Sequence, residues 1–245
     1  MMDITSVAVS EPACLRVAIA SSLLKPIEDI GNKFTQKHSI CVDFISASSG
    51  VLSAQIRNGA PYDLFISANM KYPLHLAKEG KTESNPKIFA FGGLLLWSRY
   101  PIQEKDLRQL SMSAKVQKIA IANPELAPYG EKAKNWMIEH NLLKILELKL
   151  VYGNNVNQVN LFIHSDVVEL AFTSISAREM IKDRKGYWLN ISEDTDTDLP
   201  HGVVVLSKSS NKKISFLFLN YLFEDEAKEI LSKYGYSSFE NLTLN

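Results

Sequence analysis

Short polar turns follow several apolar runs of this sequence, and each turn precedes an amphipathic stretch. Four of them carry hydroxyl or amide groups: Ser21-Ser22, Ser48-Ser49-Gly50, Pro128-Tyr129-Gly130 and Asn154-Asn155-Val156. A helix start leaves backbone N–H groups without intrahelical partners and carries a partial positive charge. Several helix starts that converge would therefore bind an anion without lysine or arginine, and serine hydroxyls would add donors.

The same turns have a second interpretation, because serine and asparagine are also the commonest N-cap residues of ordinary helices. What favours a site is the position of the turns, since each lies at the carboxyl end of a predicted strand. Ligands of open α/β sheets bind at those ends. The pattern alone leaves both interpretations open.

Strand-like and helix-like patterns alternate along almost the whole chain. A long apolar stretch over residues 87–98 is broken at Gly92-Gly93. This alternation predicts an α/β protein with mainly parallel sheets. The expected strands are 15–20, 40–45, 63–66, 118–122, 148–152, 168–173 and 202–206. The expected helices are 24–37, 51–57, 70–78, 129–140, 155–164, 176–182, 214–222 and 224–233.

The chain shows no flexible linker and no internal repeat, so a second domain would have to be inserted into the first. Two features resemble crossover segments: the Gly92-Gly93 break, and the polar loop 191–200 that leads into the strand at 202–206. If both cross, residues 1–92 plus 203–245 form one lobe, lobe I. Residues 93–202 then form the inserted lobe II.

Composition and missing motifs exclude several classes of protein. The 245 residues contain 27 basic and 27 acidic side chains, a formal charge of zero, which argues against a nucleic-acid binder. No apolar stretch approaches the roughly 20 residues of a membrane-spanning helix. The five histidines are far apart, so no metal cation site is predicted. Neither a phosphate-binding loop nor a nucleophile elbow is present, and an α/β enzyme remains a weaker alternative.

One segment resembles a known family. Residues 48–68 read SSGVLSAQIRNGAPYDLFISA, and their Gln-Ile, Gly-Ala-Pro and Phe-Ile-Ser-Ala elements are similar to those of molybdate-binding proteins, the substrate-binding components of molybdate ABC transporters. Similar turns of that family match 20–23, 119–130 and 154–159, and Lys233-Tyr-Gly-Tyr236 is similar to its C-terminal helix end. The resemblance covers nearly everything from 15 to 236.

The resemblance implies a type II periplasmic-binding-protein fold, with two α/β lobes joined by two crossover strands and the ligand cleft between them. It assigns hydroxyl contacts to Ser22 and Ser49, and backbone N–H contacts to Tyr129 and Val156. The family's fifth contact is a tyrosine, and Thr173 stands at that position here.

Further departures from the family pattern lie near the same position. Ser176 replaces an acidic residue, Asn69 replaces a common aspartate, and Gly93 replaces a common asparagine. The resemblance therefore leaves open whether Thr173, Tyr129 or a water supplies the contact that the family makes with its tyrosine.

The implied function is binding of molybdate, and also tungstate, and its delivery to an ABC transporter permease, without a cofactor and without catalysis. The implied protein is a periplasmic or otherwise extracytoplasmic monomer, although no apolar signal sequence precedes Arg16. Another tetrahedral oxyanion such as sulfate is the first alternative. Phosphate is less suited, because it is partly protonated at neutral pH and needs an acceptor. The effector half of a LysR-type regulator is a further alternative, but only 14 residues precede the first predicted strand.

Two cysteines, Cys14 and Cys41, stand before and within the first two predicted strands. In the implied fold these strands are neighbours about 4.8 Å apart, a spacing that permits a disulfide in an exported protein. Two free thiols are the other expectation, because the side chains would then point to opposite faces of the sheet.

Overall fold

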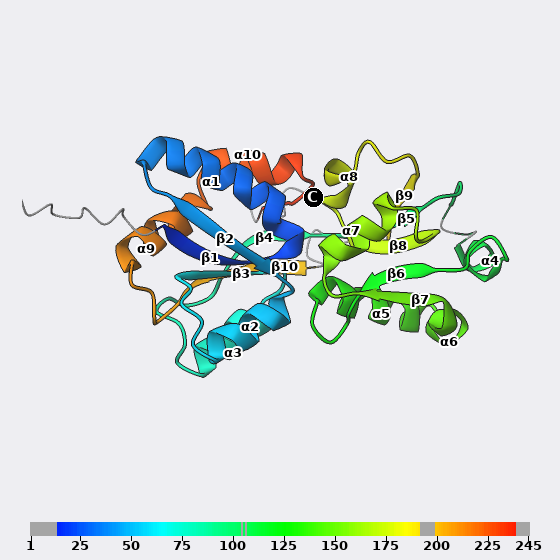
Figure 1. Ribbon diagram of the computed structural model, residues 1–245, viewed down its shortest axis with the longest axis horizontal. Coiled ribbons are helices and arrows are strands. Elements are labelled where there is room, and N and C mark those ends of the chain that lie inside the picture. The colour runs from blue at the N-terminus through cyan, green and yellow to red at the C-terminus, as the bar shows by residue number, and fades with distance from the viewer. Residues whose placement is uncertain (1–13, 104, 106, 192–198, 239–245) are drawn as a thin grey trace, which may run out of the picture.

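The computed structural model describes residues 14–103, 105, 107–191 and 199–238. Two five-stranded sheets lie side by side along the long axis of the molecule, and helices cover both faces of each sheet (Figure 1). We call the first sheet with its helices lobe I and the second sheet with its helices lobe II. This arrangement is the expected fold of two α/β lobes.

Lobe I contains a sheet with the strand order β2-β1-β3-β10-β4. Its strands are β1 (Leu15–Ala20), β2 (Val42–Ala47), β3 (Leu64–Ser67), β4 (Lys87–Gly92) and β10 (Leu199–Val205). Its helices are the 3₁₀ turn η1 (Ser21–Leu23), α1 (Leu24–His38), α2 (Ser49–Arg57), α3 (Lys71–Lys78), α9 (Lys212–Tyr221) and α10 (Asp225–Lys233).

Lobe II contains a sheet with the order β7-β6-β8-β5-β9. Its strands are β5 (Leu94–Ser98), β6 (Ile119–Ala122), β7 (Leu150–Gly153), β8 (Leu170–Ser174) and β9 (Tyr187–Asn190). Its helices are α4 (Leu107–Met112), α5 (Pro128–Glu139), α6 (Leu143–Leu146), η3 (Glu147–Lys149), α7 (Val156–His164) and α8 (Ala177–Met180). The sequence patterns did not predict the short elements α4, α6 and β9.

The expectation of mainly parallel sheets was wrong, because both sheets are mixed. In lobe I, β1 runs parallel to β2 and β3, whereas β10 is antiparallel to β3 and β4. In lobe II, β6 runs parallel to β7 and β8, whereas β5 is antiparallel to β8 and β9. The antiparallel strands are those next to the crossings between the lobes, where no helix returns the chain to the same edge of the sheet.

The chain passes from lobe I to lobe II at Gly93, between β4 and β5. Most of the polar loop expected at the return crossing, residues 192–198, lies outside the described residues. β10 begins three residues before the predicted strand and runs through Pro200, with a register shift between His201 and Gly202. The lobe boundaries expected at 92/93 and 202/203 remain predictions.

Helix α1 shows how the sequence pattern produces this packing. Ile27, Ile30 and Phe34 recur at spacings of three and four residues, which places them on one face of a helix. All three are fully buried. The ring of Phe34 packs edge-on against Phe218 of α9, at 5.0 Å between ring centroids. The amphipathic face of α1 therefore joins the N-terminal and C-terminal parts of lobe I.

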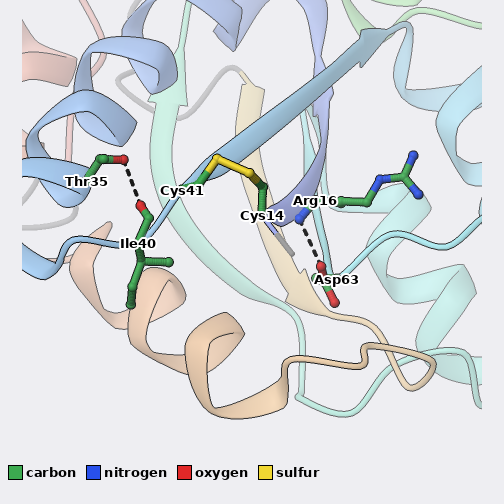
Figure 2. The surroundings of a disulfide bond; sticks show 6 residues. All are labelled: Cys14, Arg16, Thr35, Ile40, Cys41 and Asp63. Carbon is green, nitrogen blue, oxygen red and sulfur yellow. Dashed lines mark hydrogen bonds between the residues drawn. A yellow bond between two sulfur atoms is a disulfide. The ribbon is translucent and has the colours of Figure 1, made fainter. Parts of the chain in front are cut away.

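Cys14 and Cys41 form a disulfide that links the start of β1 to the residue before β2 (Figure 2). Their Cα atoms are 4.6 Å apart, within the usual range for bridged cysteines. The parallel register pairs Leu15 with Val42, so the two preceding residues stand opposite each other on the same face. The expectation of free thiols was wrong because it assumed opposite faces.

Candidate functional site

The strand register brings the predicted turns of each lobe to one edge of its sheet. In lobe I, Ala20 pairs with Ala47, so the turns that begin at Ser21 and Ser48 are neighbours. In lobe II, Ala122 pairs with Gly153, the last residues of β6 and β7. Helices α5 and α7 begin a few residues beyond these strand ends. Both lobes therefore present helix starts at the carboxyl ends of their parallel strands.

A small cavity of about 10 Å³ lies between these two edges. Its volume is about that of one water-sized sphere. No charged side chain of the described residues lines it. The lining comes from both lobes: Ala20, Ser21, Ser22, Ser48, Ser49, Ala68, Ala127, Pro128, Tyr129 and Val156.

The hydroxyl groups of Ser22 and Ser48 are buried beside this cavity without a hydrogen-bond partner among the described residues. The exposed fractions of the two residues are 2% and 3%. A buried hydroxyl without a partner is costly, so almost all such groups in proteins are satisfied. Two of them at one cavity indicate a place where an acceptor binds.

Ser49, at the start of α2, is fully buried and already has one partner. Its Oγ accepts a hydrogen bond from the backbone N–H of Ala68 at 3.1 Å. The Ser49 hydroxyl proton is therefore left to donate. Since Ala68 follows β3, this bond also fixes the turn after β3 against the start of α2.

Val156 and Tyr129 bring the starts of α7 and α5 to the cavity from lobe II. Asn155 caps α7, and its side chain accepts from the Gln158 N–H at 3.1 Å. This cap leaves Val156 as the first residue of the helix, where a backbone N–H has no intrahelical acceptor. Tyr129 is the second residue of α5, after Pro128.

Gly50 allows the two lobes to approach each other at this site. Its N–H donates to the carbonyl oxygen of Leu126 across the junction at 2.9 Å. A Cβ atom at this position would lie 2.8 Å from that same oxygen. A residue with a side chain would therefore push the lobes apart.

Thr173 lies outside the cavity lining. It is fully buried in β8, and its hydroxyl donates to the side-chain oxygen of Asn160 on α7 at 2.6 Å. The structure thus brings together Ser22, Ser49, Tyr129 and Val156, but places Thr173 against a neighbouring helix. The cavity is also lined by residues that the sequence did not predict as ligand contacts. Among them, Ser21 and Ser48 could have been found, because they lie in the same polar turns as Ser22 and Ser49.

Aromatic residues and a histidine pack beside the cavity, at the crossing between the lobes. The Nδ1 atom of His201, on β10, lies 2.6 Å from the Leu199 carbonyl oxygen, and its Nε2 atom lies 3.5 Å from the Tyr129 hydroxyl. The Tyr236 ring packs edge-on against His201, with centroids 5.3 Å apart. A Cβ at Gly92 would come within 2.4 Å of the Tyr129 hydroxyl. Gly92 therefore makes room for this cluster.

His201 and Tyr236 are both uncharged at neutral pH. Burial lowers the pKa of His201 to about 4, partly opposed by its hydrogen bond to the Leu199 carbonyl. Burial raises the pKa of Tyr236 to about 12, partly opposed by hydrogen bonds with Ser176 and Tyr129. Among the described residues, those that line the cavity and those of this cluster thus offer hydroxyl and N–H donors but no ionised group.

Other kinds of site find no support in the part of the chain that the structure describes. No group of three or more histidine, cysteine, aspartate or glutamate side chains there could hold a metal ion. Among the described helices, none has the length and apolar character needed to cross a bilayer.

Comparisons with known proteins agree with this geometry. The chain is 30% identical over 233 residues to the molybdate-binding protein ModA of Azotobacter vinelandii, covering 93% of this chain and 91% of that protein. It is also 30% identical over 220 residues to ModA of Rhodobacter capsulatus, covering 89% of this chain and 86% of that protein.

Solved structures show the same fold. The periplasmic molybdate-binding protein of Azotobacter vinelandii matches with a TM-score of 0.81 at 26% identity, covering 91% of this chain and 98% of that one. The sulfate-binding protein SubI from Mycobacterium tuberculosis matches with a TM-score of 0.77 at 10% identity, covering 94% of this chain and 88% of that one; this match shows the fold alone. The family model of the bacterial extracellular solute-binding proteins matches residues 15–237, and the chain belongs to that family.

Proposed function

We propose that this chain binds molybdate, and also tungstate, in the cavity between the lobes and delivers it to the permease of an ABC transporter. The observation that carries the proposal is the cavity itself, which is lined by hydroxyl groups and helix starts and, among the described residues, by no charged side chain. Such donors suit a fully ionised dianion. The named function of the ModA relatives supports molybdate as that dianion.

Each lobe supplies part of the proposed contact set. Ser22 and Ser49 donate their hydroxyls from lobe I, and Tyr129 and Val156 donate backbone N–H groups from lobe II. A ligand held by both lobes favours their closure around it, a hinge mechanism. Thr173 is the fifth predicted contact. To reach the ligand, its hydroxyl would have to leave Asn160.

The remaining parts of the proposal follow from the family. We expect binding without a chemical reaction, in a monomer that works outside the cytoplasm, as the family description and the periplasmic relative suggest. An ABC permease is the partner to which such a monomer would hand over its ligand.

Thermal unfolding with a panel of oxyanions tests the proposal. Ligand at 100 times its Kd stabilises a folded protein by about 2.7 kcal/mol, so molybdate and tungstate should raise the melting temperature clearly. Phosphate should have little effect, because its protonated form needs an acceptor and the proposed contacts are all donors.

Sulfate is the informative arm of the panel, since it is also a tetrahedral dianion. Equal stabilisation by sulfate and molybdate would replace the proposal with a general oxyanion binder. No stabilisation by millimolar molybdate would reject it. The Ser22→Ala/Ser49→Ala double variant serves as control, because a shift that persists in it arises elsewhere on the protein.

A further inference from the structure

Two buried side chains meet at one backbone carbonyl beside the cavity. The Ser176 hydroxyl donates to the carbonyl oxygen of Ser22 at 2.9 Å, and the Tyr236 hydroxyl donates to the same oxygen at 2.8 Å. The two hydroxyl oxygens lie 3.2 Å from each other. Ser176 is fully buried and Tyr236 is 3% exposed, so water does not compete for these bonds.

The partners come from different parts of the chain. Ser22 belongs to η1 of lobe I, whereas Ser176 follows β8 and precedes α8 of lobe II. Tyr236 follows α10, whose C-terminal end lies beside α8 (Figure 1). A Cβ at Gly235, next to Tyr236, would lie 2.8 Å from the Ile175 side chain. The C-terminal segment of lobe I thus packs directly against lobe II.

The same segment is fixed to the crossing between the lobes. The Phe91 N–H of β4 donates to the Ser237 carbonyl oxygen at 2.8 Å, and the Ser237 N–H donates back at 3.1 Å. This pairing places Tyr236 beside Gly92, where the chain leaves lobe I. Tyr236 therefore contacts the hinge region, lobe II and a residue of the proposed anion site at once.

We infer that Tyr236 and Ser176 are positioning residues that latch the two lobes together through the Ser22 carbonyl group. The inference rests on the proposed function in that Ser22 is taken as an anion contact. The bond from Ser176 crosses between the lobes, and the bond from Tyr236 holds the Ser22 peptide in the orientation that accepts it.

The latch favours the closed arrangement whether or not a ligand is present. Bonds that form only when the lobes are together shift the equilibrium between open and closed forms. Removing one of them raises the open population, and ligand affinity falls in proportion to the loss of the closed, competent form. For a hydrogen bond of ordinary net strength this is about a two- to tenfold change.

The variants Tyr236→Phe and Ser176→Ala test the latch, with Tyr234→Phe as the matched control. Tyr236→Phe keeps the buried ring and removes only the hydroxyl. Tyr234 lies two residues earlier, and its hydroxyl donates to Asp29 of α1 at 2.6 Å, a bond within lobe I. The control therefore loses a tyrosine hydroxyl from the same segment without removing a hydrogen bond between the lobes.

The first readout is the distance between the lobes in ligand-free protein. Spin labels report this distance by pulsed dipolar spectroscopy. They are attached at Gln36→Cys on α1 and Asn135→Cys on α5, which are both exposed positions, and no reductant is added. Tyr236→Phe and Ser176→Ala should increase the share of long distances, and Tyr234→Phe should not. Distributions that match the control in both variants overturn the latch.

The second readout is the Kd for molybdate by calorimetry. Each latch variant should bind about two- to tenfold more weakly than the control, and the double variant should lose less than the product of both factors, because the bonds form one network. Fully multiplicative losses would show independent effects and reject the latch. If the parent protein does not bind molybdate, the proposed function fails, while the ligand-free distances still decide the latch.

Discussion

The hydroxyl oxygen of Ser49 accepts the backbone N–H of Ala68 at 3.1 Å, whereas the hydroxyl of Ser22 has no partner among the described residues. Ser22 and Ser49 have the same proposed role in binding but different roles in the structure. The Ser49 hydroxyl links two turns of lobe I, whereas the Ser22 hydroxyl does not.

Replacing each serine by alanine distinguishes its contribution to ligand binding from its contribution to the stability of the fold. Ser22→Ala and Ser49→Ala should each weaken molybdate binding by roughly 1.5–3 kcal/mol, the range for a hydrogen bond to a charged partner. Ser49→Ala should also lower the free energy of unfolding by about 1–3 kcal/mol, because the buried Ala68 N–H is left unpaired. Ser22→Ala should leave stability nearly unchanged. Calorimetry and urea unfolding measure the two quantities; unaltered affinity in both variants would show that the serines are only structural.

Thr173→Val tests whether the threonine at the family's tyrosine position contacts the ligand. The substitution keeps the shape and removes the hydroxyl that bonds to Asn160. We expect a loss of about 1–3 kcal/mol in stability, since the buried amide oxygen loses its donor, and a change in Kd of less than about twofold, since Thr173 does not line the cavity. A much weaker Kd would show instead that the hydroxyl turns to the ligand.

The buried imidazole of His201 should make the protein sensitive to acid. Its pKa is lowered to about 4 in the folded state, below the value of about 6.5 in an unfolded chain. Between these values the unfolded chain binds a proton that the folded protein does not, so stability falls as the pH drops from about 6.5 to 4. The loss reaches about 3 kcal/mol at the lower limit.

Urea unfolding at a series of pH values measures this effect. His201→Gln should remove the part of the loss that develops between pH 6.5 and 4. His164→Gln is the control, because His164 is exposed at the end of α7. A pH profile that is the same in His201→Gln and the parent would show that other groups cause the acid sensitivity.

The disulfide should stabilise the fold without affecting the site. Cys14 and Cys41 are 27 residues apart, and closing a loop of this length restricts the unfolded chain by about 3–4 kcal/mol. The double variant Cys14→Ser/Cys41→Ser should lose about that much. Its Kd for molybdate should stay the same, because the bridge lies at the opposite end of β1 from Ala20 and the cavity. A large change in Kd would contradict this separation.

Much of the fold could be predicted from periodicity, because most strands and helices have patterns of their own. The spacing of Ile27, Ile30 and Phe34 marks α1, and the break at Gly92-Gly93 marks the passage between the sheets. The short strand β9 has no such signal, since its two half-buried residues stand side by side between two exposed ones and do not alternate. It exists because β5 offers an edge with which it pairs, and pairing partners are not visible in a local pattern.

In the candidate site, too, local features could be predicted from the sequence and contacts between distant residues could not. Turns such as those at Ser22 and Ser49 could be predicted because a helix start is a local feature. The surroundings of Thr173 and Tyr236 could not, because their partners are 13 and 214 residues away along the chain. Proximity at that range is produced by the packing of the lobes.

The absence of ionised groups around the cavity, among the residues that the structure describes, has an electrophoretic consequence. The chain has a formal charge of zero, and no described side chain that lines the cavity would take up a proton when a dianion binds. The loaded protein would carry the whole charge of its cargo. Loaded and unloaded molecules would then migrate differently in a native gel and separate on an anion exchanger.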